Sequence, residues 1–362
     1  MRKLFSSLVK ASTRVALADY FTAATSGALT AAFALLIEDL FPKPGDQLDL
    51  SPVRFVVFGI LVLVVLAAML LRRRFRTTAG TLLSVQVLDE GMGDLTTNEE
   101  SRELAQDRAM SIRTVHRWAD LPGSTRGGVI DVVDTCAEAG AAADLLVNTV
   151  PEDGRIVVAP NLLWPIALSV GGALPLAERD VWLVELSTHD KHPNEEFELD
   201  KSDLHAAVPV DLDPIELKEP SGDRVGVSIN LTQAQVTSQP DELLRSFEVR
   251  TVHHVHRPGG VGEVVEVDGR LQVHFSGAEL ARVARSVAVQ LVRIKESCGE
   301  RELVVTARMP KTVAVAVGWY LAQFKCRFYR GTHLLHYSGP GKPTLPMRVR
   351  RAQSSRFGAE PV

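Results

Sequence analysis

The sequence contains only three cysteines among its 362 residues, and they lie far apart at Cys136, Cys298 and Cys326. No Cys-x-x-Cys pair occurs, which excludes a zinc site built from cysteines. Isolated cysteines are typical of reduced thiols, so we expect the part of the chain that contains them to be cytosolic.

The chain also lacks the short motifs of common hydrolases and nucleotide-processing enzymes. HExxH, GxSxG and Walker sequences are all absent. The segment PGGVGE at 258–263 lacks the third glycine of a dinucleotide-binding loop and is expected to form a turn. In HHVH, His254 and His256 share one face of a strand, but no neighbouring Asp or Cys completes a set of metal ligands. We therefore expect no catalytic residues, no cofactor and no bound metal.

Acidic residues outnumber basic ones after the first fifth of the chain. Residues 1–76 carry a net charge of +5, and since the whole chain totals −4, the remaining residues carry −9. A protein that follows a polyphosphate backbone needs many cations. The acidity therefore argues against a long nucleic acid as the partner, whereas a small nucleotide held by a few local cations is compatible with it.

Two stretches near the beginning of the chain are long and uncharged. Residues 55–71 read FVVFGILVLVVLAAMLL and are followed at once by RRRFR, and residues 20–37 form a second, weaker stretch. A helix that crosses a bilayer needs about 20 mainly apolar residues. We therefore predict that residues 1–76 form a transmembrane hairpin with spans at about 17–37 and 53–71. A helix buried in a soluble core is the alternative for the more apolar stretch.

The charges that flank these spans predict their orientation. Basic residues precede the first span and follow the second, while the short connection at 38–51 is acidic. Because positive charge is retained on the cytoplasmic side, both chain ends are expected in the cytoplasm. No small-residue cleavage site precedes the second span, which argues against a signal peptide.

The first span has small residues at a four-residue spacing, namely Ala23, Gly27 and Ala31. They share one helix face and would let a neighbouring helix approach closely. That neighbour could be the second span of the same chain or a span of another protomer, and the sequence leaves both open.

From residue 77 onward, strand patterns alternate with helix patterns. We expect strands at 81–88, 155–159, 181–186, 224–231, 247–255, 263–275, 302–307 and 332–337, the sixth of these a hairpin turned at Asp268-Gly269. Helices are expected at 129–150, 161–174, 277–297 and 310–324, and residues 98–118 are expected to form an exposed helix or helix pair. This alternation predicts an α/β domain with a parallel sheet. We place it at 77–345, with halves at 77–215 and 216–345 and a C-terminal tail at 346–362.

The two halves contain nearly the same phrase. RIVVAPNLLWPIALSVGGAL at 155–174 aligns without a gap with ELVVTARMPKTVAVAVGWYL at 302–321, so that a valine pair, a Val-Gly pair and a final leucine recur at matching positions. Coincidence between two Ala/Val-rich segments is the alternative, and the matched order of elements weakens it. The repeat predicts two fused Rossmann-like units with pseudo-twofold symmetry. The shared glycine is expected to let each helix pack closely on its sheet.

The ends of the repeated strands are the expected ligand site, because an open α/β sheet binds ligands beyond the carboxyl ends of its strands. Each repeated strand leads into a helix N-terminus, where free amides favour an anion. Arg308 and Lys311 add positive charge there, Trp164 offers a flat face to a base, and the loop after Leu231 is rich in hydrogen-bonding side chains. These parts suit a ligand with phosphates and bases. The simpler alternatives are that Arg308 pairs with a surface acid and that Trp164 belongs to the core.

The blocks PNLLWPIALSVG, VWLVEL, VSINLT and VVTARMPKTVAVAVGWYLAQFKCRFYRGTHLLHY resemble the SAVED domain family, in which two CARF-like Rossmann units are fused. The resemblance covers residues from about 77 to 340. It implies a sensor of cyclic di- or oligonucleotides in CBASS-type bacterial anti-phage defence. Many members carry a nuclease, TIR or protease effector, whereas the hairpin is the only attachment expected here. This arrangement resembles the transmembrane-SAVED class, in which ligand binding assembles protomers, disrupts the inner membrane and aborts infection.

By position, the resemblance places ligand-binding residues in three segments. These residues are Pro160, Asn161, Leu162, Trp164, Asn230, Thr232, Gln233, Arg308, Met309, Lys311 and Thr312. The implied protein is a nucleotide-gated effector of the bacterial inner membrane, whose partners are a cyclic nucleotide, membrane lipid and further copies of the chain. A membrane-tethered enzyme that degrades the nucleotide, and a tethered scaffold without a ligand, are the alternatives.

Overall fold

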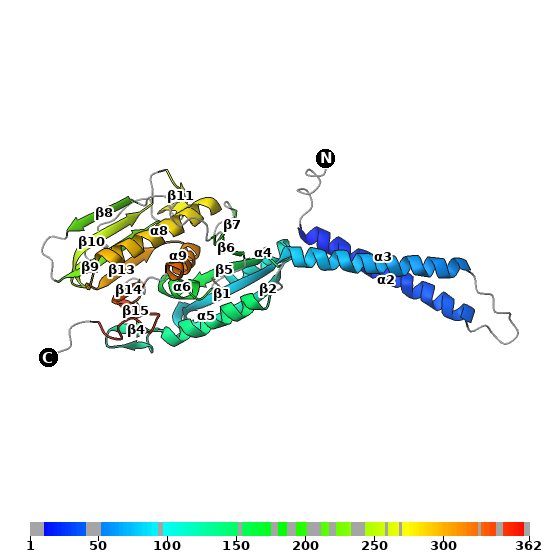
Figure 1. The fold of residues 1–362 in the computed structure, drawn as a ribbon, viewed down its shortest axis with the longest axis horizontal. Helices are drawn as coiled ribbons and strands as arrows, with labels where there is room; N and C mark the ends of the chain where they lie inside the picture. Colours follow the sequence, from blue (N-terminus) through cyan, green and yellow to red (C-terminus); the bar gives the residue numbers. More distant parts are fainter. Residues whose placement is uncertain are drawn as a thin grey trace. The chain divides into compact units, whose positions relative to one another are not determined.

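The structure is a computed structural model of the full chain (Figure 1). It describes residues 11–40, 52–92, 97–150, 154–174, 180–186, 193–200, 211–216, 222–232, 243–257, 260–267, 270–324, 327–337 and 343–357. The chain divides into two compact units. The first comprises Met1–Thr81, Arg102–Ser111 and Pro151–Arg155, and the second comprises the rest. Each unit is described by itself.

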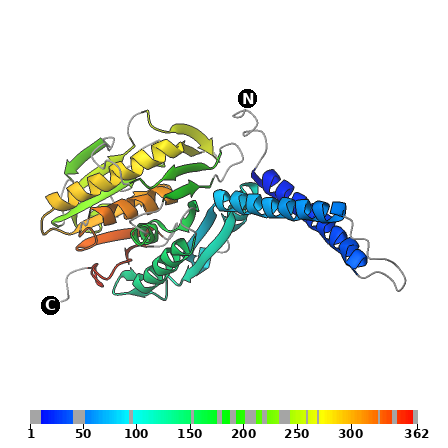
Figure 2. The ribbon, with the colours of Figure 1, turned by 45° about the vertical axis from the view of Figure 1, so that its right-hand side comes forward.

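The first unit is dominated by two long helices, α2 (Ala11–Leu40) and α3 (Pro52–Ala79). Proline is well placed at the start of α3, since the first turn of a helix does not use its missing N–H. The two helices lie side by side (Figure 2), and the rings of Phe33 and Phe58 are 5.9 Å apart between centroids. The predicted spans lie within these helices. In the described part of the chain, no helix combines the length and the apolarity that crossing a membrane requires.

Many large apolar side chains of α2 and α3 are exposed. They include Phe21, Phe33, Leu35, Ile37, Val53, Phe55, Val56, Val57, Ile60, Leu63, Leu66, Met69 and Leu70. The small residues Ala23, Gly27 and Ala31 are exposed too. A Cβ atom built on Gly27 would have no neighbour within 4 Å. The small-residue face of α2 is therefore not the face that packs on α3.

The first sheet of the second unit is five-stranded in the described residues, with the order β2-β1-β5-β6-β7. Its strands are β1 (Thr81–Asp89), β2 (Ser111–Ala119), β5 (Ile156–Leu162), β6 (Val181–Glu185) and β7 (Glu195–Glu198). The helices of this half are the 3₁₀ turn η1 (Glu90–Met92), α4 (Thr97–Asp107), α5 (Val133–Asn148) and α6 (Trp164–Gly171). Strands β1 and β5 are almost wholly buried because both of their faces are covered.

The second sheet has the order β3-β4-β15-β14-β13-β9-β10-β8 in the described residues. Its strands are β3 (Thr125–Arg126), β4 (Val129–Asp131), β8 (Asp211–Glu216), β9 (Arg224–Asn230), β10 (Val249–His256), β13 (Leu303–Arg308), β14 (Thr332–Tyr337) and β15 (Thr344–Arg348). Strands β10, β9, β13 and β14 pair in parallel, and β8 and β15 run antiparallel beside them. Helices α8 (Gly277–Ser297) and α9 (Lys311–Gln323) lie side by side (Figure 1). The hairpin β11 (Glu263–Val267) and β12 (Arg270–His274) forms the expected antiparallel pair.

The two sheets share one strand order. In the first, β2-β1-β5-β6 follow each other in space, and in the second β10-β9-β13-β14 do so, which is the order 2-1-3-4 in both cases. In each sheet the next strand, β7 or β15, runs antiparallel to the last of the four. The repeated phrase corresponds to β5–α6 in one half and β13–α9 in the other. The topology therefore agrees with the predicted α/β fold of two Rossmann-like units.

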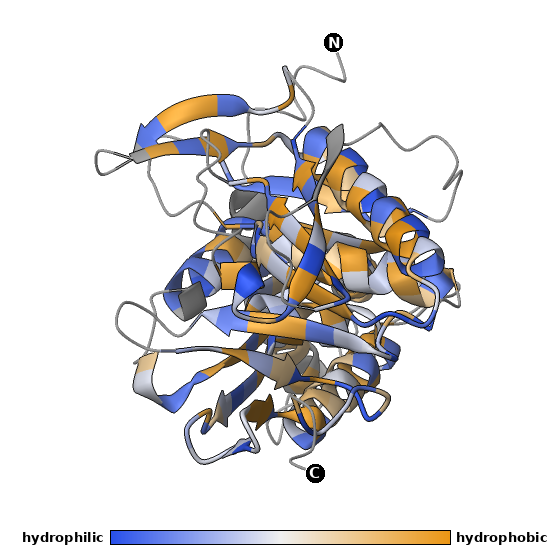
Figure 3. Ribbon diagram, turned by 90° about the vertical axis from the view of Figure 1, so that its left-hand side faces the viewer, coloured by the Kyte–Doolittle hydropathy of each residue, from blue (hydrophilic) through white to orange (hydrophobic). Residues whose placement is uncertain are grey.

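The repeated glycines have a different role from the predicted one. A Cβ on Gly171 would lie 1.9 Å from the carbonyl oxygen of Val315 in α9, and a Cβ on Gly318 would lie 2.0 Å from that of Leu168 in α6. The contact is reciprocal: Gly171 faces Val315, three residues before Gly318, and Gly318 faces Leu168, three residues before Gly171. They allow the two helices to cross, rather than each helix to approach its own sheet. Figure 3 shows hydrophobic residues distributed along many of the strands and helices, interspersed with hydrophilic ones.

Three strands, β7, β8 and β15, lie where no strand was predicted, and two predicted helical segments contain strands. Residues 98–118 were expected to be helical, but after α4 the chain forms strand β2 at the edge of the first sheet. The expected helix at 129–150 begins with strand β4, because Ile130 and Asp131 pair in parallel with Met347 and Arg348 of β15. In both places, pairing with a remote strand overrides the local helical pattern.

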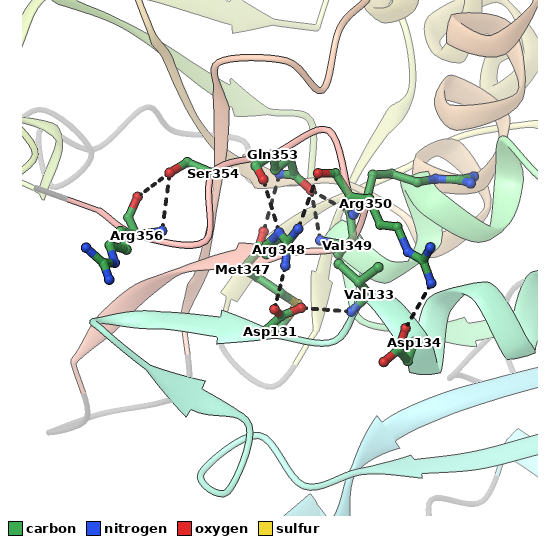
Figure 4. A network of polar contacts seen from close by, with 11 residues as sticks. Asp131, Val133, Asp134, Met347, Arg348, Val349, Arg350, Gln353, Ser354 and Arg356 are labelled. Carbon is green, nitrogen blue, oxygen red and sulfur yellow. Dashed lines mark hydrogen bonds and ion pairs between the residues drawn. The ribbon is translucent and has the colours of Figure 1, made fainter.

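Residues 348–356 take part in a polar network (Figure 4). Arg348 donates to the Asp131 carboxylate at 2.7 Å. The side-chain oxygen of Gln353 accepts the backbone N–H groups of Val349 and Arg350 at 2.8 and 3.0 Å. Part of the predicted tail is therefore ordered, since it contains the end of β15 and the buried Gln353.

Candidate functional site

A cavity of about 620 Å³ opens at the carboxyl ends of β9, β13 and β14. Its lining comprises Met92, Leu162, Leu163, Trp164, Ser228, Ile229, Asn230, Thr232, Leu243, Thr306, Ala307, Arg308, Met309, Lys311, Leu335, His336, Tyr337 and Thr344. Small-molecule sites in proteins typically measure about 300–1,000 Å³. The cavity is thus large enough for a drug-sized or nucleotide-sized compound.

The register of the parallel strands brings the polar groups of this cavity together. Asn230 is the last residue of β9 and is paired with Arg308, the last residue of β13. On its other side, Asn230 is paired with His256 at the end of β10. Ser228 and Thr306 form a second pair one step deeper in the sheet. Because parallel strands end at the same sheet edge, residues 78 positions apart in the sequence become neighbours.

Both halves of the molecule contribute to the cavity. Leu162, Leu163 and Trp164 come from the end of β5 and the start of α6, and Met92 follows β1 in the same half. All other lining residues come from the second half. Trp164 is half-buried and also packs against the main core, so it belongs to the core and to the cavity wall.

The structure brings most of the predicted ligand residues to this cavity. Those in its lining are Leu162, Trp164, Asn230, Thr232, Arg308, Met309 and Lys311. Pro160, Asn161 and Thr312 are buried and do not line it. Gln233 lies outside the described residues. Among the lining residues, Arg308 and Lys311 carry positive charge and no aspartate or glutamate is present.

Lys311 is tied to the interior of the first half by a chain of side chains. Its ammonium donates to Asn161 Oδ1 at 2.5 Å, and Asn161 Nδ2 donates to Gln86 Oε1 at 3.2 Å. The Gln86 amide nitrogen lies 3.1 Å from Nε2 of His116. Burial lowers the pKa of Lys311, although the Glu185 and Glu100 carboxylates act in the opposite direction. Asn161 therefore acts on the cavity through Lys311 rather than by lining it.

The N-terminus of α9 already holds an anion that belongs to the protein. The Glu185 carboxylate accepts the backbone N–H of Thr312 at 3.3 Å and also its hydroxyl group. Burial raises the pKa of Glu185, while the two hydrogen bonds from Thr312 and the charge of Lys311 oppose that rise. The prediction of free amides at this helix end is therefore wrong for Thr312, because a carboxylate from β6 occupies the place of the expected ligand anion.

The sequence analysis did not identify the part of the site formed by β14. His336 and Tyr337, the last two residues of this strand, line the cavity together with Thr344 of β15. His336 is 4% exposed, and burial lowers its pKa, although Asp89 acts in the opposite direction. The available signal was the polar ending of THLLHY, since polar residues at the carboxyl end of a predicted parallel strand point to the ligand edge.

The remaining candidate groups do not form a second centre. The rings of His254 and His256 stack with centroids 5.6 Å apart, which agrees with their predicted common face. Within the described ranges, no three His, Cys, Asp or Glu side chains gather in a way that could hold a metal ion. Cys136 is buried, and its burial raises the pKa of the thiol to about 12. Such a thiol is protonated at neutral pH and is a poor nucleophile.

Comparison with known proteins identifies no relative by sequence: no family model and no curated protein matches the chain. Similar solved structures include the Acinetobacter baumannii Cap4 SAVED/CARF-domain containing receptor, which is 10% identical with a TM-score of 0.37. The same receptor with the cyclic trinucleotide 2'3'3'-cAAA is 9% identical with a TM-score of 0.41, and the Moraxella osloensis receptor is 9% identical with a TM-score of 0.36. Each match covers 80% of this chain and 53–55% of the other. The chain therefore spans about half the length of these structures.

Proposed function

We propose that this protein is a receptor for a cyclic di- or oligonucleotide and acts as an effector in CBASS-type anti-phage defence. The observation that supports this most is the shared cavity, to which both Rossmann-like halves contribute residues at their strand ends. Arg308 and Lys311 supply charge for phosphates, and Trp164 and Tyr337 supply flat faces on which bases can stack. The resemblance of the sequence blocks to the SAVED family points to the same class of ligand.

The size and charge of the site favour a compact ligand. A cavity of about 620 Å³ with two cationic side chains suits a small phosphate ring and not a long polyphosphate backbone. The absence of carboxylates from the described lining also favours an anion. We therefore propose that the protein is a receptor for the nucleotide and not an enzyme that degrades it.

We further propose that α2 and α3 form the effector part and contact membrane lipid. Their exposed phenylalanine, leucine, valine and methionine side chains are costly in water and favourable in a bilayer. The basic residues on both flanks support an orientation in which the two chain ends lie in the bacterial cytoplasm, next to the inner membrane. This part of the proposal rests on side-chain exposure and flanking charge.

Assembly of several copies of the chain would connect ligand binding in the α/β domain to the action of α2 and α3. A ligand that binds the assembled state more tightly than the single chain shifts the equilibrium toward assembly. The exposed face formed by Ala23, Gly27 and Ala31 supports packing between protomers over packing within the chain, since Gly27 has no neighbour within 4 Å. Clustered hairpins would then disturb the bilayer.

Ligand binding is tested by thermal unfolding of the full-length protein with a panel of cyclic di- and trinucleotides. At about 100 times Kd, a specific ligand stabilises the native state by about 2.7 kcal/mol. We expect Arg308→Gln to weaken binding about ten- to hundredfold, because a hydrogen bond to a charged group contributes about 1.5–3 kcal/mol. Arg327→Gln is the control, since Arg327 is exposed and outside the cavity lining. If no nucleotide of the panel binds, the receptor proposal is contradicted. If the protein degrades a bound nucleotide, the tethered enzyme is supported instead.

Membrane action is tested with Gly27→Leu in vesicles loaded with a dye. We expect ligand-dependent leakage from the unaltered protein and its loss in Gly27→Leu, with ligand binding retained. Gly59→Leu is the matched control, because Gly59 lies on α3 and also has nothing within 4 Å of a built Cβ. Full leakage from Gly27→Leu shows that this face does not cluster the hairpins. Equal loss in both variants points to a general effect of leucine on the helices.

A further inference from the structure

One buried polar atom in the cavity wall lacks a partner. His336 is 4% exposed and lines the cavity, yet its Nε2 atom has no hydrogen bond to any residue in the described ranges. Buried polar groups in folded proteins are nearly always paired, and an unpaired one is unfavourable. An unpaired nitrogen on a residue that lines an open cavity is therefore a position at which a ligand atom could complete the pairing.

A second histidine on the same strand shows the contrasting case. His333 is also 4% exposed, and its Nε2 lies 3.3 Å from the Glu302 carboxylate. The two histidines are three residues apart, so they project from opposite faces of β14. His333 does not line the cavity. Within the described residues, neither Nε2 atom has a hydrogen bond by geometry, but the histidine on the far face has a carboxylate within ion-pair distance.

The surroundings of His336 identify the kind of ligand group that fits. Burial lowers its pKa, so the imidazole is neutral at neutral pH and provides one donor and one acceptor nitrogen. The lining of the same cavity includes hydroxyl groups and apolar side chains, among them Ser228, Thr306 and Leu335, and the Asp89 carboxylate acts on His336 from outside the lining. Phosphates favour cations, which the cavity holds at Arg308 and Lys311 instead. A neutral polar edge on a flat apolar ring matches this wall, and a nucleobase has that character.

We propose that Nε2 of His336 hydrogen-bonds the edge of a nucleobase in the bound cyclic nucleotide, with Tyr337 beside it as a stacking face, and that this contact determines base preference. Arg308 and Lys311 hold phosphates. This inference rests on the proposed function, and it assigns base recognition to β14 and phosphate binding to the β13–α9 segment. Phosphate contacts make affinity depend on salt, whereas base contacts discriminate between sequences. The two roles are therefore separable by measurement.

The experiment uses full-length protein and a set of cyclic trinucleotides that share their linkages and differ in their bases. For His336→Leu we expect at least tenfold weaker binding of the preferred member, a smaller ratio between the best and second-best members, and an unchanged salt dependence. For Arg308→Gln we expect weaker binding of all members and a salt slope reduced by about 1. His333→Leu, the matched control, is expected to lower thermal stability but keep affinity and base preference.

The outcomes distinguish this inference from the proposed function. If the unaltered protein binds none of the trinucleotides or the corresponding cyclic dinucleotides, both are overturned. If it binds and a folded His336→Leu protein keeps the same affinity and base preference, only the role of His336 is overturned. Should His336→Leu fail to fold, His336→Gln replaces it. Glutamine retains a hydrogen-bonding end with different geometry, so we expect a changed order of base preference, and an unchanged order contradicts the proposal.

Discussion

Lys311 determines the orientation of every side chain in the polar series that runs into the first half. An ammonium group can only donate, so the oxygen of Asn161 must face it, and the Asn161 nitrogen must then face the Gln86 oxygen. The Gln86 nitrogen consequently points at Nε2 of His116, which lies 3.1 Å away. A charge beside the cavity is thereby connected to a ring on the edge strand β2.

Asn161→Leu tests this series at the residue scale. The substitution removes the acceptor of Lys311 and the donor to Gln86, and each buried group left unpaired costs about 1–3 kcal/mol. We expect the free energy of unfolding, measured with urea, to fall by roughly 3 kcal/mol. Asn148→Leu on the exposed end of α5 is the control and should change it by no more than about 0.5 kcal/mol. A loss below about 1 kcal/mol for Asn161→Leu is inconsistent with a coupled series.

The crossing of α6 and α9 is the feature that matters most at the scale of elements. Its two glycines come from the repeated phrase, and each lies against a backbone carbonyl of the other helix. A carbonyl cannot move aside as a flexible side chain can, so an added methyl group must push the helices apart. Because both helices lead directly from strands that end at the cavity, their separation would also alter the site.

Gly171→Ala and Gly318→Ala test this crossing. In an ordinary helix, alanine is favoured over glycine by about 1 kcal/mol. Here we expect each substitution to destabilise the protein by about 3 kcal/mol or more, because overpacking against backbone exceeds that propensity gain. The neighbouring Gly172→Ala should cost much less, since its nearest contact is the end of the Arg350 side chain at 3.2 Å. Chemical unfolding of the three variants measures the difference, and equal effects at all three positions contradict the role of the crossing.

Buried histidines make the stability of the whole molecule depend on pH. Burial lowers the pKa of His333 and His336, and burial together with the charge of Arg301 lowers the pKa of His253, all from an ordinary value of 6.5. Below pH 6.5 the unfolded chain therefore binds more protons than the folded protein, and stability falls as the pH falls. Glu185 acts in the opposite sense, because its raised pKa makes the folded state bind more protons than the unfolded chain above pH 4.5.

We expect the melting temperature to be lower at about pH 5.5 than at about pH 7.5. The double variant His333→Leu/His336→Leu should show a smaller difference between these two conditions, because the two groups that gain protons on unfolding are gone. Calorimetry at both pH values measures the difference, with Glu185→Gln used to remove the opposing contribution. A pH dependence that is the same in the double variant and the unaltered protein excludes these histidines as its source.

Sequence patterns predicted the elements that depend on local periodicity. The strands expected at 81–88, at 155–186 and from 224 to 337 and helices α6, α8 and α9 begin and end close to their predicted positions. Strands β7, β8 and β15 were not predicted. Two segments predicted as helix contain strands instead. They are the nine-residue edge strand β2 and the three-residue strand β4, and strand pairing within the sheets determines their conformation. The hairpin orientation, the assembly face and the ligand contacts stay predictions.

By itself, the sequence determined the duplication, the α/β class and most of the segments that line the cavity. Periodicity depends only on residues near one another in the chain, and the duplication is visible because its two copies are similar in sequence. Only the tertiary structure decided the contacts: the glycines meet a helix instead of a sheet, Glu185 occupies the amide of Thr312, and His336 faces a cavity without a partner. These outcomes depend on which strand lies beside which, and that is set by packing between residues more than a hundred positions apart.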